Sequence, residues 1–199
     1  MDDTGNSVFL RGVLAGAPVY SHMGGGERYD IFPLEVERLS GYTDRLNIIA
    51  RASLLASAEA SGGDKLAVAG VLRSYNNRSG VGSRLVITVL ARSLGADTGP
   101  DENRVALAGT LCKAPVLRVT PMGRRICDLM LAVNRPYGRS DYLPVIAWGG
   151  SASFAAGLDV GDRIRLTGRM QSREYVKLTD GVPLRRTAFE VSAVTLERE

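Results

Sequence analysis

The sequence predicts an all-β protein built from two copies of one small five-stranded barrel. Three observations predict this architecture. The chain of 199 residues is 45% hydrophobic, enough for two cores of about 100 residues each. Its 23 glycines and 8 prolines are scattered among short apolar runs, a pattern typical of many short strands joined by turns. An internal repeat then divides the chain in two.

The repeat keeps its order and nearly constant spacing. The segment NSVFLRGVLAGAPV from residue 6 matches NRVALAGTLCKAPV from residue 103, an offset of 97 residues. The same offset relates Leu34 to Leu131 and Asp44 to Asp141, and at an offset of 98 GDKL from residue 63 matches GDRI from residue 161. We therefore expect one domain at 1–96 and a second at 103–199. A short linker of turn formers and acids, GADTGPDE at 95–102, joins them.

Alternating apolar residues predict the strands of each copy. The first strand ends before an Ala-Pro pair, because proline cannot lie in the middle of a sheet. A Gly-rich turn at 23–26, or a Pro-Met-Gly turn at 121–124, leads by a hairpin to the second strand. A short Ala-rich helix with a serine cap follows the third strand, and a Gly-Asp turn opens the fourth. The expected strands are 8–14, 29–36, 45–51, 65–73 and 83–94, then 105–111, 126–134, 142–148, 163–173 and 186–196, with helices at 53–60 and 151–158.

Five strands with a helix between the third and fourth are the arrangement of the OB-fold, a Greek-key barrel. The sequence thus predicts two tandem OB-folds. Their charges differ. The chain has 25 basic residues, of which 22 are Arg, and a net charge of +4. Residues 1–97 have no net charge, so the whole excess of positive charge lies in the second half. Arginine favours phosphate binding and stacking on bases.

Aromatic and basic residues gather in the second copy. Tyr142 and Trp148 are six residues apart, so in a regular strand both project from one face. Arg135, Arg139, Arg169 and Arg173 bring positive charge to the same region. Rings beside guanidinium groups are what a single nucleic-acid strand needs, because bases stack on the rings while phosphates meet the charges. The alternative, that these aromatics are core residues, is open on this stretch alone.

The second copy resembles the bacterial single-stranded DNA-binding protein family from residue 103 to 196. The motifs that carry the resemblance are NRVALAG from 103, DLMLAVNRPY from 128, DYLPVIAWG from 141, GDRIRLTG from 161 and RMQSREY from 169. The family implies an OB-fold that stacks single-stranded DNA along a basic groove. Its stacking positions match Tyr137, Tyr142, Trp148 and Tyr175, and all four are aromatic here.

The first copy departs from this pattern. Arg45 and Arg51 stand in place of Tyr142 and Trp148, and Leu39 and Asn77 fall where the other two rings would be. Tyr42 and Tyr75 lie close by in the sequence. Two hypotheses remain: the first copy binds the strand mainly through arginines (Arg45, Arg51, Arg73 and Arg78), or it has become a structural partner domain. Its neutral charge favours the second hypothesis.

The residues offer no catalytic or metal-binding constellation. His22 is the only histidine, and Ser151 lacks the spacing of a nucleophile motif. Cys112 and Cys127 have no further ligands near them, so no zinc site is expected. The sequence therefore predicts a binding protein, not an enzyme, without cofactor or metal.

The expected partners are single-stranded DNA and a second copy of the chain, since the family implies four OB-folds per assembly and two lie here. The sequence reaches Glu199 directly after the last expected strand, so we do not expect recruitment of replication and repair enzymes through the acidic tip that family members usually carry. No apolar run reaches about 18 residues and the N-terminus is acidic, so a cytoplasmic protein without membrane contact is expected.

The function that the sequence predicts is sequence-independent binding and protection of single-stranded DNA in replication, recombination or repair. The alternative hypothesis is a structural or primosome-type OB module with little or no DNA binding of its own. The aromatic set and the positive charge of the second copy favour the first hypothesis.

Overall fold

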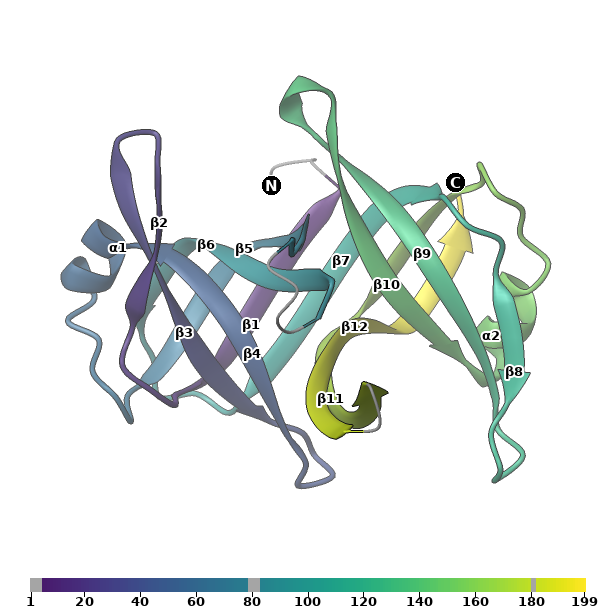
Figure 1. The fold of residues 1–199 in the computed structure, drawn as a ribbon, viewed down its shortest axis with the longest axis horizontal. Helices are drawn as coiled ribbons and strands as arrows, with labels where there is room; N and C mark the ends of the chain where they lie inside the picture. Colours follow the sequence, from purple (N-terminus) through teal and green to yellow (C-terminus); the bar gives the residue numbers. More distant parts are fainter. Residues whose placement is uncertain (1–4, 79–82, 180–181) are drawn as a thin grey trace. The chain divides into compact units, whose positions relative to one another are not determined.

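The computed structural model describes residues 5–78, 83–179 and 182–199 (Figure 1). Residues 1–4 and 79–82 of the expected first domain, and 180–181 of the second, lie outside this description. The chain divides into two compact units. Of the described residues, the N-terminal unit comprises 7–73 and 88–104, and the C-terminal unit comprises 5–6, 74–78, 83–87, 105–179 and 182–199. Each is described by itself below.

The described part of the first repeat forms six strands and a helix. Their bounds are β1 (Asn6–Leu14), β2 (Val19–Gly24), β3 (Glu27–Glu37), β4 (Thr43–Arg51), α1 (Ala52–Ser57), β5 (Lys65–Asn76) and β6 (Leu85–Ala96). The strands follow the order β3-β4-β6-β5-β1, and β1 pairs again with β3, which closes a five-stranded barrel. β4 and β6 run parallel, whereas the other pairs with printed registers are antiparallel. β2 extends β3 as a hairpin outside the barrel.

The second repeat has the same topology. Its elements are β7 (Glu102–Leu111), β8 (Val116–Val119), β9 (Arg125–Arg135), η1 (Pro136–Gly138), β10 (Arg139–Trp148), α2 (Gly149–Ala155), β11 (Arg163–Thr179) and β12 (Val182–Arg198). The order β7-β11-β12-β10-β9 is closed by a pairing of β7 with β9. In both repeats a helix separates the third and fourth barrel strands. The prediction of two OB-folds is confirmed.

Both cores follow from the alternation of side chains along the strands. In β1 the residues Val8, Leu10 and Leu14 are buried while their neighbours are more exposed. A strand with one face toward the barrel interior requires this period of two. The interior of the two barrels is filled mainly by aliphatic residues, including Leu34, Leu46, Ile48, Leu66, Leu107, Leu111, Leu131, Leu143 and Ile164.

The glycines at equivalent positions 12 and 109 allow the barrels to close. A Cβ atom on Gly12 would lie 2.2 Å from the carbonyl oxygen of Glu35, and one on Gly109 would lie 2.6 Å from that of Ala132. Any side chain at either position would meet backbone, which cannot move aside as a flexible side chain can. Close packing against the backbone thus explains why both repeats have glycine at this position.

Two expectations from the sequence need correction. β2 and β8 were not expected as separate strands, because most or all of their residues are exposed and show no alternation of burial. The helices begin at Ala52 and Gly149, directly after a strand, so Arg51 and Trp148 occupy the N-cap positions. Neither helix has a side-chain cap hydrogen bond. The expected serine caps are therefore wrong, since the serines lie inside the helices.

The segment between β6 and β7 is held against the N-terminal unit. The guanidinium group of Arg11 lies 2.9 Å from Asp97 and 2.9 Å from Glu102, and it donates to the carbonyl of Pro100 at 3.1 Å. Lys65 lies 2.6 Å from Asp101. The segment that the sequence marks as a linker is thus fixed to this unit by several charged contacts.

Candidate nucleic-acid interface

The outward face of β10 carries two of the predicted aromatic residues. Asp141, Leu143 and Val145 point inward and are buried, so the alternate residues point outward. Tyr142 is 48% exposed and Trp148 is 39% exposed. Both rings therefore lie on one face of the C-terminal barrel, Tyr142 near the start of the strand and Trp148 at its end.

The other two predicted rings lie on neighbouring elements. Tyr137 lies in η1, at the tip of the β9–β10 hairpin, with a positive φ of 64° and 99% of its surface exposed. Tyr175 lies on β11 and is half-buried. The guanidinium carbon of Arg173 lies 5.8 Å from the centre of the Tyr175 ring, within the range of a cation–π contact.

The four predicted arginines divide into two groups. Arg139, Arg169 and Arg173 are exposed. Arg135, in contrast, donates from Nε to Asp141 at 2.7 Å and from Nη2 to the same carboxylate and to the carbonyl of Ser74. Because Asp141 is completely buried, the charge of Arg135 is engaged inside the C-terminal unit.

Ser74 holds this ion pair at the start of β10. Its backbone N–H donates to Asp141 at 2.6 Å, and its hydroxyl accepts from the backbone N–H of Tyr142 at 2.7 Å. Its carbonyl accepts from Arg135 at 3.1 Å. Backbone and side chain of one serine thus fix the strand segment that carries Tyr142.

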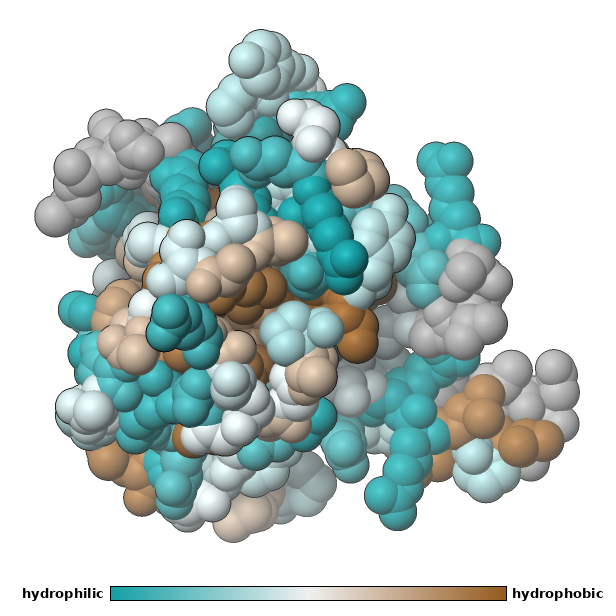
Figure 2. Space-filling view, turned by 90° about the vertical axis from the view of Figure 1, so that its left-hand side faces the viewer, coloured by the Kyte–Doolittle hydropathy of each residue, from teal (hydrophilic) through white to brown (hydrophobic). Residues whose placement is uncertain are grey.

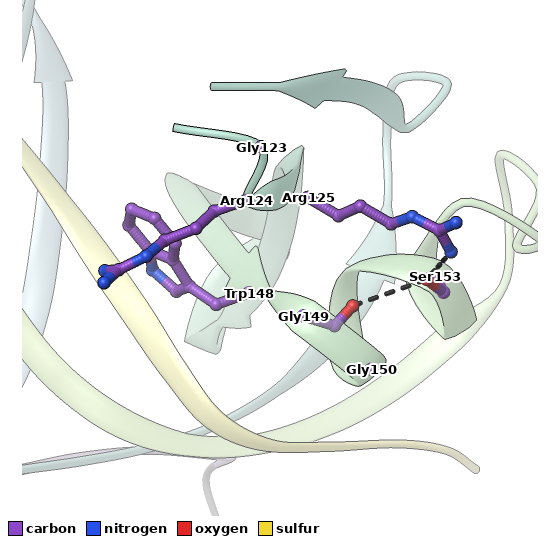
Figure 3. A pocket seen from close by; sticks show the side chains of 7 residues that line it. All are labelled: Gly123, Arg124, Arg125, Trp148, Gly149, Gly150 and Ser153. Carbon is purple, nitrogen blue, oxygen red and sulfur yellow. Dashed lines mark hydrogen bonds between the residues drawn. The ribbon is translucent and has the colours of Figure 1, made fainter. Parts of the chain in front are cut away.

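Trp148 lines a pocket of about 670 Å³ (Figure 3). The rest of the lining consists of Gly123, Arg124, Arg125, Gly149, Gly150 and Ser153. Arg125 reaches toward α2 and donates to the Ser153 hydroxyl at 3.2 Å. In Figure 3 the side chain of Arg124 extends the other way, on the side of the indole ring. The pocket therefore combines one flat ring with two guanidinium groups.

Arg124 and Arg125 were not among the residues predicted for the site. The sequence analysis treated this segment only as the turn before the second strand. The missed signal is the register of the hairpin: Ile126 lies directly opposite Trp148. Residues just before Ile126 must then lie beside the tryptophan. Two consecutive arginines at that point indicate a basic wall for the pocket.

The equivalent face of the N-terminal unit has a different charge pattern. Arg45, in place of Tyr142, lies 2.7 Å from Glu35, and Arg51, in place of Trp148, lies 3.0 Å from Glu27. Leu39 is fully exposed. Each of these two arginines therefore faces an acidic residue of β3, whereas the C-terminal unit has Ala132 and Arg124 at the corresponding positions.

The described residues contain no group of three or more His, Cys, Asp and Glu that would hold a metal ion. Within the same residues, no helix is both long and apolar enough to span a membrane.

Comparison with known proteins agrees with the geometry of the C-terminal unit. Residues 102–198 match the model of the single-strand binding protein family. The single-stranded DNA-binding protein of Clostridium tetani is 38% identical over 98 residues, which are 46% of this chain and 66% of that protein. Single-stranded DNA-binding protein 3 of Listeria innocua is 38% identical over 80 residues, covering 37% of this chain and 50% of its own length.

The second repeat, residues 102–198, belongs to the single-strand binding protein family. The similarity also extends to the whole fold. The crystal structure of the wild-type single-stranded DNA-binding protein from Thermus aquaticus superposes with a TM-score of 0.79 at 26% identity. That match covers 98% of this chain and 92% of the Thermus chain, so it includes both OB-folds.

The match to the single-strand binding protein family places the second repeat among binding proteins. The match to the family model covers the second repeat, where the exposed rings and arginines lie. The chain spans about half to two thirds of the length of the Clostridium and Listeria relatives.

Proposed function

We propose that this chain binds single-stranded DNA without sequence preference and protects it during replication, recombination or repair. The observation that carries the proposal is the outward face of β10, where Tyr142 and Trp148 are exposed on one surface and Trp148 adjoins two arginines. A flat ring beside guanidinium groups suits a base and its phosphate together. The relatives named above are single-stranded DNA-binding proteins, which supports the same conclusion.

In the proposed complex the strand lies across β9, β10 and β11 of the C-terminal unit. Bases stack on Tyr137, Tyr142, Trp148 and Tyr175, each contributing about 1–3 kcal/mol. Phosphates meet the exposed guanidinium groups of Arg139, Arg169 and Arg173, joined by Arg124. Arg135 acts indirectly, because its ion pair with Asp141 fixes the start of β10. Binding is stoichiometric and involves no chemical step, and each OB-fold occludes about 4–16 nucleotides.

The proposal includes a homodimer with four OB-folds and a cytoplasmic location, where replicating DNA is found in bacteria. Edge strands of a sheet present unpaired backbone groups that favour pairing with another chain. A structural or primosome-type module with little or no DNA binding of its own is the alternative. This alternative assigns no role to Tyr142 and Trp148, which are exposed beside arginines.

The test uses the intrinsic fluorescence of the protein. Trp148 is the only tryptophan, so its emission reports on one predicted stacking position. Titration with poly-dT should quench this emission strongly, and added salt should weaken the binding because phosphate contacts release counterions. Duplex DNA is the control and should leave the emission unchanged. No quenching together with no mobility shift of labelled poly-dT would overturn the proposal.

A further inference from the structure

A second ring-and-arginine arrangement lies on the N-terminal unit, with its ring at a position that the family resemblance does not mark. β2, β3 and β4 are neighbours, and their registers place His22 opposite Tyr29 and Tyr29 opposite Arg51. Directly opposed residues of antiparallel strands project from the same face. The three side chains therefore form one row across three strands.

The contacts within this row are close. The rings of His22 and Tyr29 are stacked, with centres 4.9 Å apart and planes 3° from parallel. The glycine at position 24 makes room for them, since a Cβ there would lie 3.3 Å from the Tyr29 ring. On the other side, Arg51 lies directly opposite Tyr29 and pairs with Glu27 at 3.0 Å. Interaction with the Tyr29 side chain, followed by the charge of Glu27, raises the pKa of Arg51 above its usual value.

Tyr29 and Arg51 also line a pocket of about 510 Å³. Its remaining walls come from β6 and α1 and combine apolar, hydroxyl and guanidinium groups: Ser53, Leu54, Ser57, Leu90, Ala91 and Arg92. Figure 2 shows the side of the molecule that carries α1, where hydrophobic surface lies among hydrophilic side chains. An apolar wall with a basic rim suits a base and its phosphate.

This pocket occupies the same place in its OB-fold as the Trp148 pocket does in the other. Both lie where the third barrel strand meets the following helix. Between the repeats the ring has changed strands, since it lies on β3 in the first repeat and on β10, the equivalent of β4, in the second. Trp148 corresponds to Arg51 by the offset of 97 residues, and Ile126 corresponds to Tyr29. Each pocket therefore contains one aromatic ring and two arginines, although the first repeat has no aromatic residue at the position equivalent to Trp148.

We propose that Tyr29 and Arg51 form a second binding site for single-stranded DNA, in the N-terminal unit. A base packs against Tyr29, which His22 supports by stacking, and the adjacent phosphate meets Arg51 and Arg92. This site rests on the proposed function, because it engages the same strand. It is weaker than the Trp148 site, since Glu27 pairs with Arg51 where the second repeat has Arg124. The pair is exposed, so a phosphate can replace the carboxylate at small cost.

The experiment moves the single fluorophore from one pocket to the other in the full chain. Trp148→Phe keeps a stacking ring in the C-terminal unit but removes the emission. Tyr29→Trp, added to this variant, places the only tryptophan in the proposed site and preserves an aromatic ring there. Titration with oligo-dT should quench this emission, at a higher oligonucleotide concentration than Trp148 requires in the unmodified chain.

The matched control is Tyr20→Trp in the same Trp148→Phe background. Tyr20 lies opposite Asp30, the neighbour of Tyr29, so it projects from the other face of the same hairpin. Its emission should stay unchanged by oligo-dT. Equal emission of the Tyr29→Trp variant with and without DNA, while unmodified Trp148 is quenched, would overturn the second site and leave the proposed function standing. Absence of quenching at Trp148 as well would overturn both.

Discussion

The carboxylate of Asp141, which has no exposed surface, accepts hydrogen bonds from the guanidinium group of Arg135 six residues earlier. The first repeat contains the same pair: Arg38 donates two hydrogen bonds of 2.6 Å to Asp44, which is 1% exposed. Both repeats keep this pair, although the first repeat has no aromatic residues at the stacking positions. This indicates that the pair has a structural role at the base of the hairpin.

Arg135→Ala should therefore lower stability rather than change the salt dependence of DNA binding. Removing one partner leaves the Asp141 charge buried without compensation, which destabilises proteins by about 3–5 kcal/mol. Urea unfolding followed by circular dichroism measures this loss. Arg139→Ala is the matched control, because Arg139 is exposed and its loss should leave the unfolding midpoint unchanged. A stable Arg135→Ala variant with a reduced salt slope would contradict the structural role.

Arg124→Ala should weaken the binding of poly-dT and reduce its salt dependence. If Arg124 meets one phosphate beside Trp148, the slope of log K against log salt should fall by about 0.7. The measurement is a set of Trp148 titrations at several salt concentrations. Arg163→Ala serves as the control, because Arg163 is already paired with Glu199 at 3.0 Å. An unchanged slope for the Arg124 variant would show that its charge does not contact the strand.

The sequence predicted the barrel strands well because one face of each is buried, which imposes a clear alternation of apolar residues. It missed β2 and β8, whose side chains are mostly or wholly exposed and carry no such pattern. The same alternation placed Tyr142 between the buried Asp141 and Leu143, but it is interrupted before Trp148, where Ile146 and Ala147 are both buried. It did not reveal the pairing of Arg135 with Asp141 and Ser74, because side-chain partners distant in sequence depend on the tertiary fold.

Gly12→Ala should destabilise the N-terminal unit. The added methyl would lie 2.2 Å from the Glu35 carbonyl oxygen, so β1 and β3 must separate where the barrel closes. Overpacking of this kind destabilises proteins by about 1–3 kcal/mol or more. Thermal unfolding gives the measurement. Gly62→Ala is the control, because no atom lies within 4 Å of a Cβ at that position and its backbone needs no positive φ. Equal melting temperatures of the two variants would contradict the close approach.

Cys127 should resist thiol reagents until the protein unfolds. Its side chain has no exposed surface, and burial, followed by the charge of Asp128, raises the pKa of its thiol above the usual value. Both effects lower the amount of reactive thiolate at the surface. Labelling with Ellman's reagent before and after urea treatment, in a Cys112→Ser variant, isolates this one thiol. Fast labelling of the folded variant would indicate that the strand β9 opens locally.

Asp97→Asn should remove a contribution to stability that depends on pH in the acid range. The backbone N–H of Gly99, and then Arg11, lower the pKa of Asp97 below its usual value. A carboxylate with a depressed folded pKa stabilises the fold fully above its unfolded pKa of about 3.9. This contribution is lost as the pH falls through the lower folded value. Urea unfolding of both proteins between neutral and strongly acid pH should show a difference that is constant above about pH 5 and shrinks below about pH 4. A difference that stays constant down to the lowest pH would mean that Asp97 does not hold the segment between β6 and β7 through its charge.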